Sequence, residues 1–332
     1  MTRASQRDWL KALDIGSPSY RTEYGAAFLG DSKDFLAKLP PNSVNAIITS
    51  PPFALHKKKE YDNVPPEAYV KWFHPFAELF KRVLTEDGSL VVDLGSGWTK
   101  GQPTRSLYQY ELLLDLCKRV GFFLAQDFYW FNPAKLPTPA EWVTIRRERV
   151  KDSVDTIWWF SKSPHPKADN KRVLKEYSDA MRNLLKNGYK AKLRPSGHNI
   201  STKFRRDLGG AIPPNMFEPE NLPDLLASPW GPSNLLRHAN TESSSKYLLF
   251  CAKAGLRIHP ARWPANIPRF FVNFLTDEDD LVLDPFGGSN VTGQVAESLR
   301  RRWLCFEIER EYLEGSKFRF EKVRHPKITD FE

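Results

Sequence analysis

Short apolar runs that end in turn residues alternate with segments of helical periodicity along most of this chain, and this alternation constrains its fold most strongly. Between two such runs, residues 67–84 carry apolar side chains at helical spacing, followed by a helix-stop pattern at Glu86-Asp87-Gly88. Residues 110–131 combine a helical pattern, Gly121 and a strand, and residues 154–163 indicate another strand. Strands alternating with helices predict an α/β fold with a doubly wound, mostly parallel sheet. The buried strands expected from the apolar runs lie at 44–50 (VNAIITS), 89–95 (SLVVDLG), 281–286 (LVLDPF) and 300–309 (RRRWLCFEIE).

The middle of the chain, residues 162–250, breaks this pattern. It is rich in Pro, Gly, Ser and Asn, and it holds 15 Lys and Arg residues against 8 Asp and Glu. The resulting surplus, 15 − 8 = +7, is most of the chain's net charge of +9. A basic, loop-rich insert in an α/β core predicts a partner-binding module, although a solvated excursion has the same composition. We therefore predict a core at 20–161 and 255–325 and a recognition region at 162–254.

Cysteine usage and hydropathy exclude several classes of protein. Cys117, Cys251 and Cys305 are scattered without a CxxC pair, so neither a disulfide framework nor a zinc site is indicated, and we expect no metal. The amino terminus has no apolar signal segment, and no stretch approaches the length that spans a bilayer. A cytoplasmic protein without membrane contact is the expectation.

Residues 284–290, DPFGGSN, follow the apolar run LVL and precede a helical segment. Glycines allow close approach of a ligand, and a helix start offers unpaired N–H groups to a carboxylate. Glu307 ends the next strand 19 residues after Gly288, where an acid can bind two ribose hydroxyls. This pattern predicts a nucleotide-type cofactor, with an NAD site or a merely structural turn as alternatives. The predicted cofactor residues are Asp284, Pro285, Phe286, Gly287, Gly288, Ser289, Asn290 and Glu307.

A second motif, Ser50-Pro51-Pro52-Phe53, directly follows a predicted strand, at the end where α/β proteins bind ligands. Exocyclic amino groups of bases are poor nucleophiles, and acceptors such as the Ser50 hydroxyl and the Pro51 carbonyl can localise their lone pair. Phe53 offers a face for stacking a flipped-out base. Asp93, at the end of another strand, either receives the proton through Ser50 or is structural. An ordinary turn is the alternative for the whole motif.

These residues carry a resemblance to amino-methyltransferases whose catalytic motif precedes the cofactor motif. More closely, the chain resembles the PvuII-type cytosine-N4 DNA methyltransferases. The matching stretches are AAFLGDS (26–32), TSPPFAL (49–55), KKEY (58–61), DFYWFNPAKLP (127–137), VKDSVDTIWWFSK (150–162), RPSGH (194–198), GGAIPPN (209–215), HPARWP (259–264) and FGGSNVTG (286–293).

The resemblance implies an enzyme that transfers a methyl group from S-adenosylmethionine to cytosine N4 in double-stranded DNA. It implies a restriction–modification system, with a cognate endonuclease that forms no stable complex with this chain. It further implies that Asp31 binds near the cofactor adenine, that His259 and Arg262 flank the cofactor, and that recognition lies in the middle segment. Adenine-N6 enzymes usually have Asp where Ser50 stands, and many relatives have Gly where Asn290 stands.

Basic residues just after Ser50-Pro51-Pro52-Phe53 and in the middle segment are the predicted DNA contacts, because an enzyme that flips a base must bind phosphates and grooves around it. A solvated charge run is the alternative for the lysines. Adenine-N6 methylation, RNA methylation and an inactive nucleic-acid-binding protein remain open alternatives. The predicted DNA-binding residues are Lys57, Lys58, Lys59, Arg194, His198, Lys203, Arg205 and Arg206.

Overall fold

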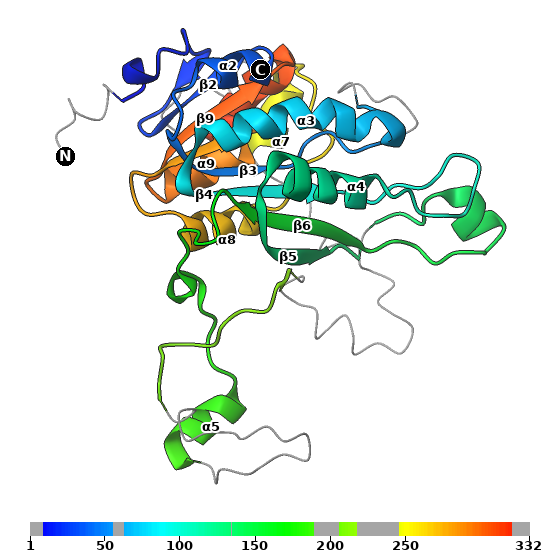
Figure 1. Cartoon of the computed structure of the whole chain (residues 1–332), viewed down its shortest axis with the longest axis vertical. Coiled ribbons are helices and arrows are strands. Elements are labelled where there is room, and N and C mark those ends of the chain that lie inside the picture. The colour runs from blue at the N-terminus through cyan, green and yellow to red at the C-terminus, as the bar shows by residue number, and fades with distance from the viewer. Residues whose placement is uncertain (1–8, 56–62, 134, 189–205, 218–245, 321–332) are drawn as a thin grey trace. The chain divides into compact units, whose positions relative to one another are not determined.

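A computed structural model of the chain describes residues 9–55, 63–133, 135–188, 206–217 and 246–320 (Figure 1). Contacts divide the chain into two compact units, one of residues 1–167 and 215–332 and one of residues 168–214. The smaller unit holds helix α5 (Asp179–Asn187), capped by the Ser178 side chain. The recognition role of residues 162–254 stays a prediction.

The larger unit is built on one sheet of nine strands among the described residues, in the order β1-β2-β9-β8-β3-β4-β6-β5-β7. The central strands β2, β9, β8, β3 and β4 are parallel neighbours, so the prediction of an α/β fold with a mostly parallel sheet is confirmed. The strands are β1 (Tyr20–Arg21), β2 (Gly25–Leu29), β3 (Val44–Thr49), β4 (Leu84–Leu94), β5 (Phe123–Phe131), β6 (Val154–Ser161), β7 (Met216–Phe217), β8 (Leu281–Asp284) and β9 (Arg302–Glu307).

Helices cover both faces of this sheet, and alternate residues of each central strand enter one of two cores (Figure 1). One face packs on α2 (Ser32–Lys38), α3 (Pro66–Val83), α4 (Tyr108–Leu114) and the π-helical turn η2 (Asp115–Val120). The other packs on α8 (Asn266–Leu275), α9 (Val291–Ser298) and α10 (Arg310–Ser316). Short helical segments and α7 complete the larger unit: η1 (Lys11–Leu13), η3 (Glu141–Ile145), α7 (Lys246–Lys253) and η7 (Lys317–Arg319). The short helix η4 (Asn170–Val173) belongs to the smaller unit.

Helix α3 shows why the periodic segments fold as they do. Its buried residues Tyr69, Phe73, Phe76, Phe80 and Val83 recur every three or four positions and form one apolar stripe on the sheet. Pro66 occupies the first helical turn, where its missing N–H costs nothing.

Helix α3 ends at Val83, just before the predicted stop pattern, and residues 86–88 belong to the start of β4, where the Gly88 carbonyl accepts from Lys162 N at 3.1 Å and the Asp87 carbonyl from Lys167 N at 2.9 Å. Strand β6 runs antiparallel to both β4 and β5, because no helix crosses the sheet between β5 and β6. Strand β5 ends and β6 begins at the same end of the sheet, where Phe131 pairs with Val154.

None of the helices in the described part of the chain has the length and apolarity needed to span a membrane.

Candidate active site

The two sequence motifs meet at one edge of the sheet, where the parallel strands β2, β9, β8, β3 and β4 have their carboxyl ends. Strand β3 leads into Ser50, and its neighbour β8 leads into the glycine turn after Asp284. Crevices at such an edge are where open α/β sheets bind their ligands.

A buried hydrogen bond fixes the motifs to each other. Thr49 Oγ1 donates to Asp284 Oδ1 at 2.7 Å, and both residues are buried. The same carboxylate oxygen accepts the backbone N–H of Phe286 at 3.2 Å. Burial raises the pKa of Asp284 to about 6, against the effect of these donors. Asp284 therefore orders the turn and places Ser50 beside it, and a direct contact with a cofactor stays a prediction.

The glycine turn leaves no room for side chains. A Cβ on Gly287 would lie 2.1 Å from Cys305 Sγ. Gly288 has a φ of +51°, and a Cβ there would lie 2.9 Å from the His259 ring. The turn is thus pressed against β9 on one side and the His259 loop on the other, which explains both glycines.

Glu307 ends β9 with its carboxylate against that turn. Its two oxygens accept the backbone N–H groups of Gly288 at 2.6 Å and Glu309 at 2.8 Å. Burial raises the pKa of Glu307 to about 7, and the nearby Asp284 adds to that rise. Each carboxylate oxygen keeps a further lone pair, so Glu307 can still accept from ligand hydroxyls.

The rest of the glycine motif holds helix α9 in place. Asn290, in the left-handed region at φ 56°, caps α9 by accepting from Gly293 N at 3.0 Å, and its amide donates to Tyr20 Oη at 3.0 Å. Ser289 Oγ accepts from Arg319 at 3.0 Å. Asn290 is fully buried, so the structure gives it a structural task, and cofactor contact by either residue stays a prediction.

Residues at two flanks complete this side of the site. Asp31 caps helix α2 by accepting from Lys33 N at 2.9 Å, and Ser32 Oγ donates to the carbonyl of Pro285. On the other flank, Arg262 donates to the His259 carbonyl, and burial lowers the pKa of the His259 ring to about 4. His259 is therefore neutral at pH 7.

The Ser50-Pro51-Pro52-Phe53 loop is held by contacts on both sides. Ser50 Oγ donates to Asp93 Oδ2 at 3.2 Å. The Pro52 carbonyl accepts from Tyr69 Oη at 2.9 Å. The Phe53 ring lies against Gly95, where a Cβ would come within 2.3 Å of the ring.

Asp93 is almost completely buried, and its Oδ1 has no hydrogen-bond partner among the described residues. Burial raises the pKa of Asp93 well above its usual range, and the neighbouring Asp155 raises it further, whereas Lys135 and the bond from Ser50 oppose the rise. A buried carboxylate with a raised pKa that bonds to a hydroxyl at a sheet edge is suited to accept a proton.

Sequence reasoning missed four residues of this site. Tyr69 and Tyr108 lie edge to face at 5.0 Å, and their hydroxyls donate to the carbonyls of Pro52 and Gly95. Asp155 and Lys135 form an ion pair beside Asp93. Tyrosines at helical spacing have the pattern of core positions, and a lone lysine has the pattern of a surface charge, so periodicity does not distinguish these residues.

Most of the predicted DNA contacts lie outside the described residues: Lys57, Lys58, Lys59, Arg194, His198, Lys203 and Arg205. Arg206 is described and exposed. These eight assignments stay predictions.

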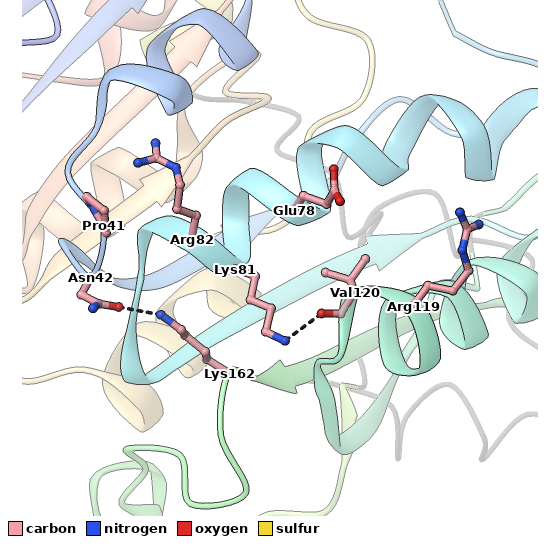
Figure 2. A pocket seen from close by; sticks show the side chains of 8 residues that line it. All are labelled: Pro41, Asn42, Glu78, Lys81, Arg82, Arg119, Val120 and Lys162. Atoms are coloured by element: carbon pink, nitrogen blue, oxygen red, sulfur yellow. Dashed lines mark hydrogen bonds between the residues drawn. The ribbon is translucent and has the colours of Figure 1, made fainter.

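A basic pocket lies at the opposite edge of the sheet, near the start of β3 and the end of β6 (Figure 2). Its lysines are already engaged. Lys81 Nζ donates to the Val120 carbonyl at 2.7 Å, and Lys162 Nζ donates to Asn42 Oδ1 at 2.5 Å, as the dashed lines in Figure 2 mark. Lys162 Nζ also donates at 2.8 Å to the carbonyl of Leu84, the C-cap of α3. Both lysines therefore stabilise carbonyls at helix carboxyl ends, which accounts for these cations without a ligand.

Comparisons with known proteins agree with this geometry. A family model described as DNA methylase, for N6 and N4 methyltransferases, matches residues 44–318. The type II methyltransferase M.PvuII of Proteus hauseri is 47% identical over 324 residues, which cover 96% of this chain and 91% of that protein. The solved structure of a PvuII DNA methyltransferase, described as cytosine-N4-specific, superimposes with a TM-score of 0.71 at 42% identity, covering 95% of this chain and 93% of the other.

A more distant structure shares the fold alone. It is a putative DNA modification methylase from Thermus thermophilus, solved with S-adenosyl-L-methionine, with a TM-score of 0.53 at 17% identity. The alignment covers 90% of this chain and 95% of that one.

Proposed function

Because the chain belongs to the N6 and N4 DNA methylase family, we propose that it methylates the N4 amino group of a specific cytosine in double-stranded DNA. The enzyme is a methyltransferase that uses S-adenosylmethionine. The cytosine assignment is supported by the M.PvuII relationship and by Ser50, where adenine-N6 enzymes usually have Asp.

The glycine turn fits S-adenosylmethionine. Gly287 and Gly288 let the turn lie directly against Cys305 and the His259 ring, and Glu307 beside it keeps acceptor capacity for two ribose hydroxyls. Asp31 and His259 flank the same turn, through the Ser32 bond to Pro285 and the packing of the imidazole on Gly288. When bound, the cofactor supplies the methyl group on a positively charged sulfur.

The observation that carries the proposal is the hydrogen bond between Ser50 Oγ and Asp93 Oδ2. When Asp93 is ionised it can only accept, so Ser50 donates to it and both lone pairs of Ser50 Oγ remain for the N–H groups of a base. Thr49, the preceding residue, is bonded to Asp284 at the start of the glycine turn. The acceptors for an amino group therefore follow directly after the residue that is hydrogen-bonded to the glycine turn.

Loop residues then orient the base. The Ser50 hydroxyl and the Pro51 carbonyl accept the two N–H groups, which draws the nitrogen toward tetrahedral geometry. Phe53 stacks on the flipped cytosine, and the Tyr69 bond to Pro52 keeps the loop in place. Positioning of this kind lowers the barrier for direct in-line transfer without a covalent enzyme intermediate.

DNA is held by the basic residues around this edge. We assign phosphate contacts to Lys57, Lys58 and Lys59 and sequence recognition to residues 162–254, with their surplus of positive charge. We place the enzyme in the cytoplasm, as the modification partner of an endonuclease that reads the same site independently.

Nucleoside analysis tests the base assignment. DNA of varied sequence is incubated with the enzyme and S-adenosylmethionine, digested to nucleosides and analysed by chromatography and mass spectrometry. The expected product is N4-methylcytosine. N6-methyladenine would overturn the cytosine assignment while keeping the family, and methylation of RNA alone would overturn the DNA assignment.

The matched control is Ser50→Ala, whose product yield should fall although calorimetry still shows cofactor binding. An inactive DNA-binding protein would instead show no cofactor binding in the wild type.

A further inference from the structure

Two buried carboxylates share one lysine at the active edge. Asp93 on β4 and Asp155 on β6 lie on neighbouring antiparallel strands, and Asp93 pairs in register with Ile157, two residues from Asp155. Both acids are almost fully buried, at 1% and 3% exposure. Lys135 Nζ forms an ion pair with Asp155, and its side chain is 23% exposed. Two acids so placed cannot both be ionised easily without a counter-charge.

Within the described part of the chain, Lys135 is the cation that lowers the pKa of both acids. Tyr69 on α3 and Tyr108 on α4 face Asp93 with neutral hydroxyls that donate to loop carbonyls. Asp152 adds negative charge near Asp155, but it is itself bonded to Arg105 at 2.8 Å. Among the described residues, Lys135 is therefore the cation that acts directly on both buried acids.

We propose that Lys135 is a positioning residue for methylation: acting with Asp155, it keeps Asp93 ionised so that Asp93 can receive the proton leaving the target amino group. The inference rests on the proposed function. Lys135 acts through Asp93 and needs no contact with the base.

The proton balance of the step gives Asp93 its task. The nitrogen–carbon bond forms as the carbon–sulfur bond breaks, and sulfur keeps that electron pair. The amino nitrogen then carries an excess proton, which passes to Ser50 Oγ while Ser50 gives its own proton to Asp93 Oδ2. A carboxyl that is already protonated cannot accept it, so the reaction slows at pH values below the pKa of Asp93.

The first test is the pH dependence of single-turnover methylation, measured between about pH 5 and pH 9 with saturating cofactor and DNA. Lys135→Met should move the acidic limb of the profile upward by about one to three pH units, and Lys135→Arg should restore it. Asp155→Asn should move the limb downward, because the carboxylate that opposes ionisation of Asp93 is removed. Opposite shifts support the proposal.

A role in folding alone predicts a different result, namely lower activity with an unmoved limb, and that outcome would overturn the proposal. The matched control is Lys38→Met, which removes an equal charge from the exposed last turn of α2 and should leave the profile unchanged.

The second test does not depend on activity. A carboxyl whose pKa is raised by folding stabilises the protein below its unfolded pKa, and this stabilisation is lost as the pH rises through the folded pKa. In Lys135→Met that loss should extend to higher pH than in the wild type, as measured by urea unfolding across pH. Identical curves would overturn the inference. Shifted curves together with no methylcytosine from the wild type would instead overturn the proposed function.

Discussion

Gly287→Ala is expected to destabilise the glycine turn by a purely steric route. The new Cβ would lie 2.1 Å from Cys305 Sγ and 3.3 Å from the Phe306 carbonyl oxygen. The backbone of Gly287 is not in the left-handed region, so alanine adds no conformational strain there. Overpacking of this kind in a close-packed interior costs about 1–3 kcal/mol.

Removing the sulfur should relieve the clash. In Cys305→Ala the nearest remaining side-chain atom is the Cβ of residue 305, 3.6 Å from the new methyl group, which is ordinary contact. Cys305→Ala alone leaves a small cavity and should cost about 1 kcal/mol. The double variant should be about as stable as Cys305→Ala, so the coupling energy equals the cost of Gly287→Ala alone, about 1–3 kcal/mol.

The four proteins of this cycle are compared by urea unfolding and by calorimetric titration with S-adenosylmethionine. Gly287→Ala should lose stability and cofactor affinity together, and the double variant should recover much of both. Strictly additive losses would refute the reasoning, because they would mean that Cys305 does not limit the space at Gly287.

Three further substitutions test other parts of the site. Ser50→Ala should lower single-turnover rates by about 10²–10⁴-fold with little change in cofactor affinity; equal losses of rate and affinity would place Ser50 in the cofactor site instead. Glu307 has a pKa raised to about 7, so it stabilises the fold at low pH, and its contribution of about 3 kcal/mol should be lost as the pH rises from about 5 through 7. Urea unfolding across this range should show that decline in the wild type and a flatter curve in Glu307→Gln; parallel curves would assign the decline to other groups. Gly95→Ala should displace the Phe53 ring and remove about 1–3 kcal/mol of base stacking, seen as weaker DNA binding at unchanged cofactor affinity; unchanged DNA binding would mean that Phe53 does not stack on the base.

The sheet and its active edge were predictable because their signals are local. A buried parallel strand is a continuous apolar run, and the turn residues after it mark its carboxyl end. Residues 44–50 and 281–286 both showed this pattern, so their motifs were expected at one edge, where the structure has them. The acid at the end of β9 followed from spacing alone.

Other features depend on contacts that no local pattern records. The antiparallel direction of β6 is set by the return of residues 132–153 at one edge, and the apolar run 154–161 is the same in either direction. Lys135 became part of the site only because that return brings it to Asp155. Likewise Asn290 was recognised only as part of the glycine motif. Its hydrogen bonds with Gly293 and Tyr20 depend on the assembled fold.

The strand order has a consequence for how the chain folds as it is synthesised. Strand β3 pairs with β4 soon after both are made, but its other neighbour, β8, follows about 230 residues later in the sequence. Until then one side of β3 is an unpaired strand edge, a form of structure prone to wrong pairing. Because β8 and β9 close the sheet and bring the glycine turn to Ser50, activity arises only when nearly the whole chain is complete. A separately supplied carboxyl-terminal piece that carries β8 and β9 should therefore restore methylation activity to an amino-terminal piece that ends after β6.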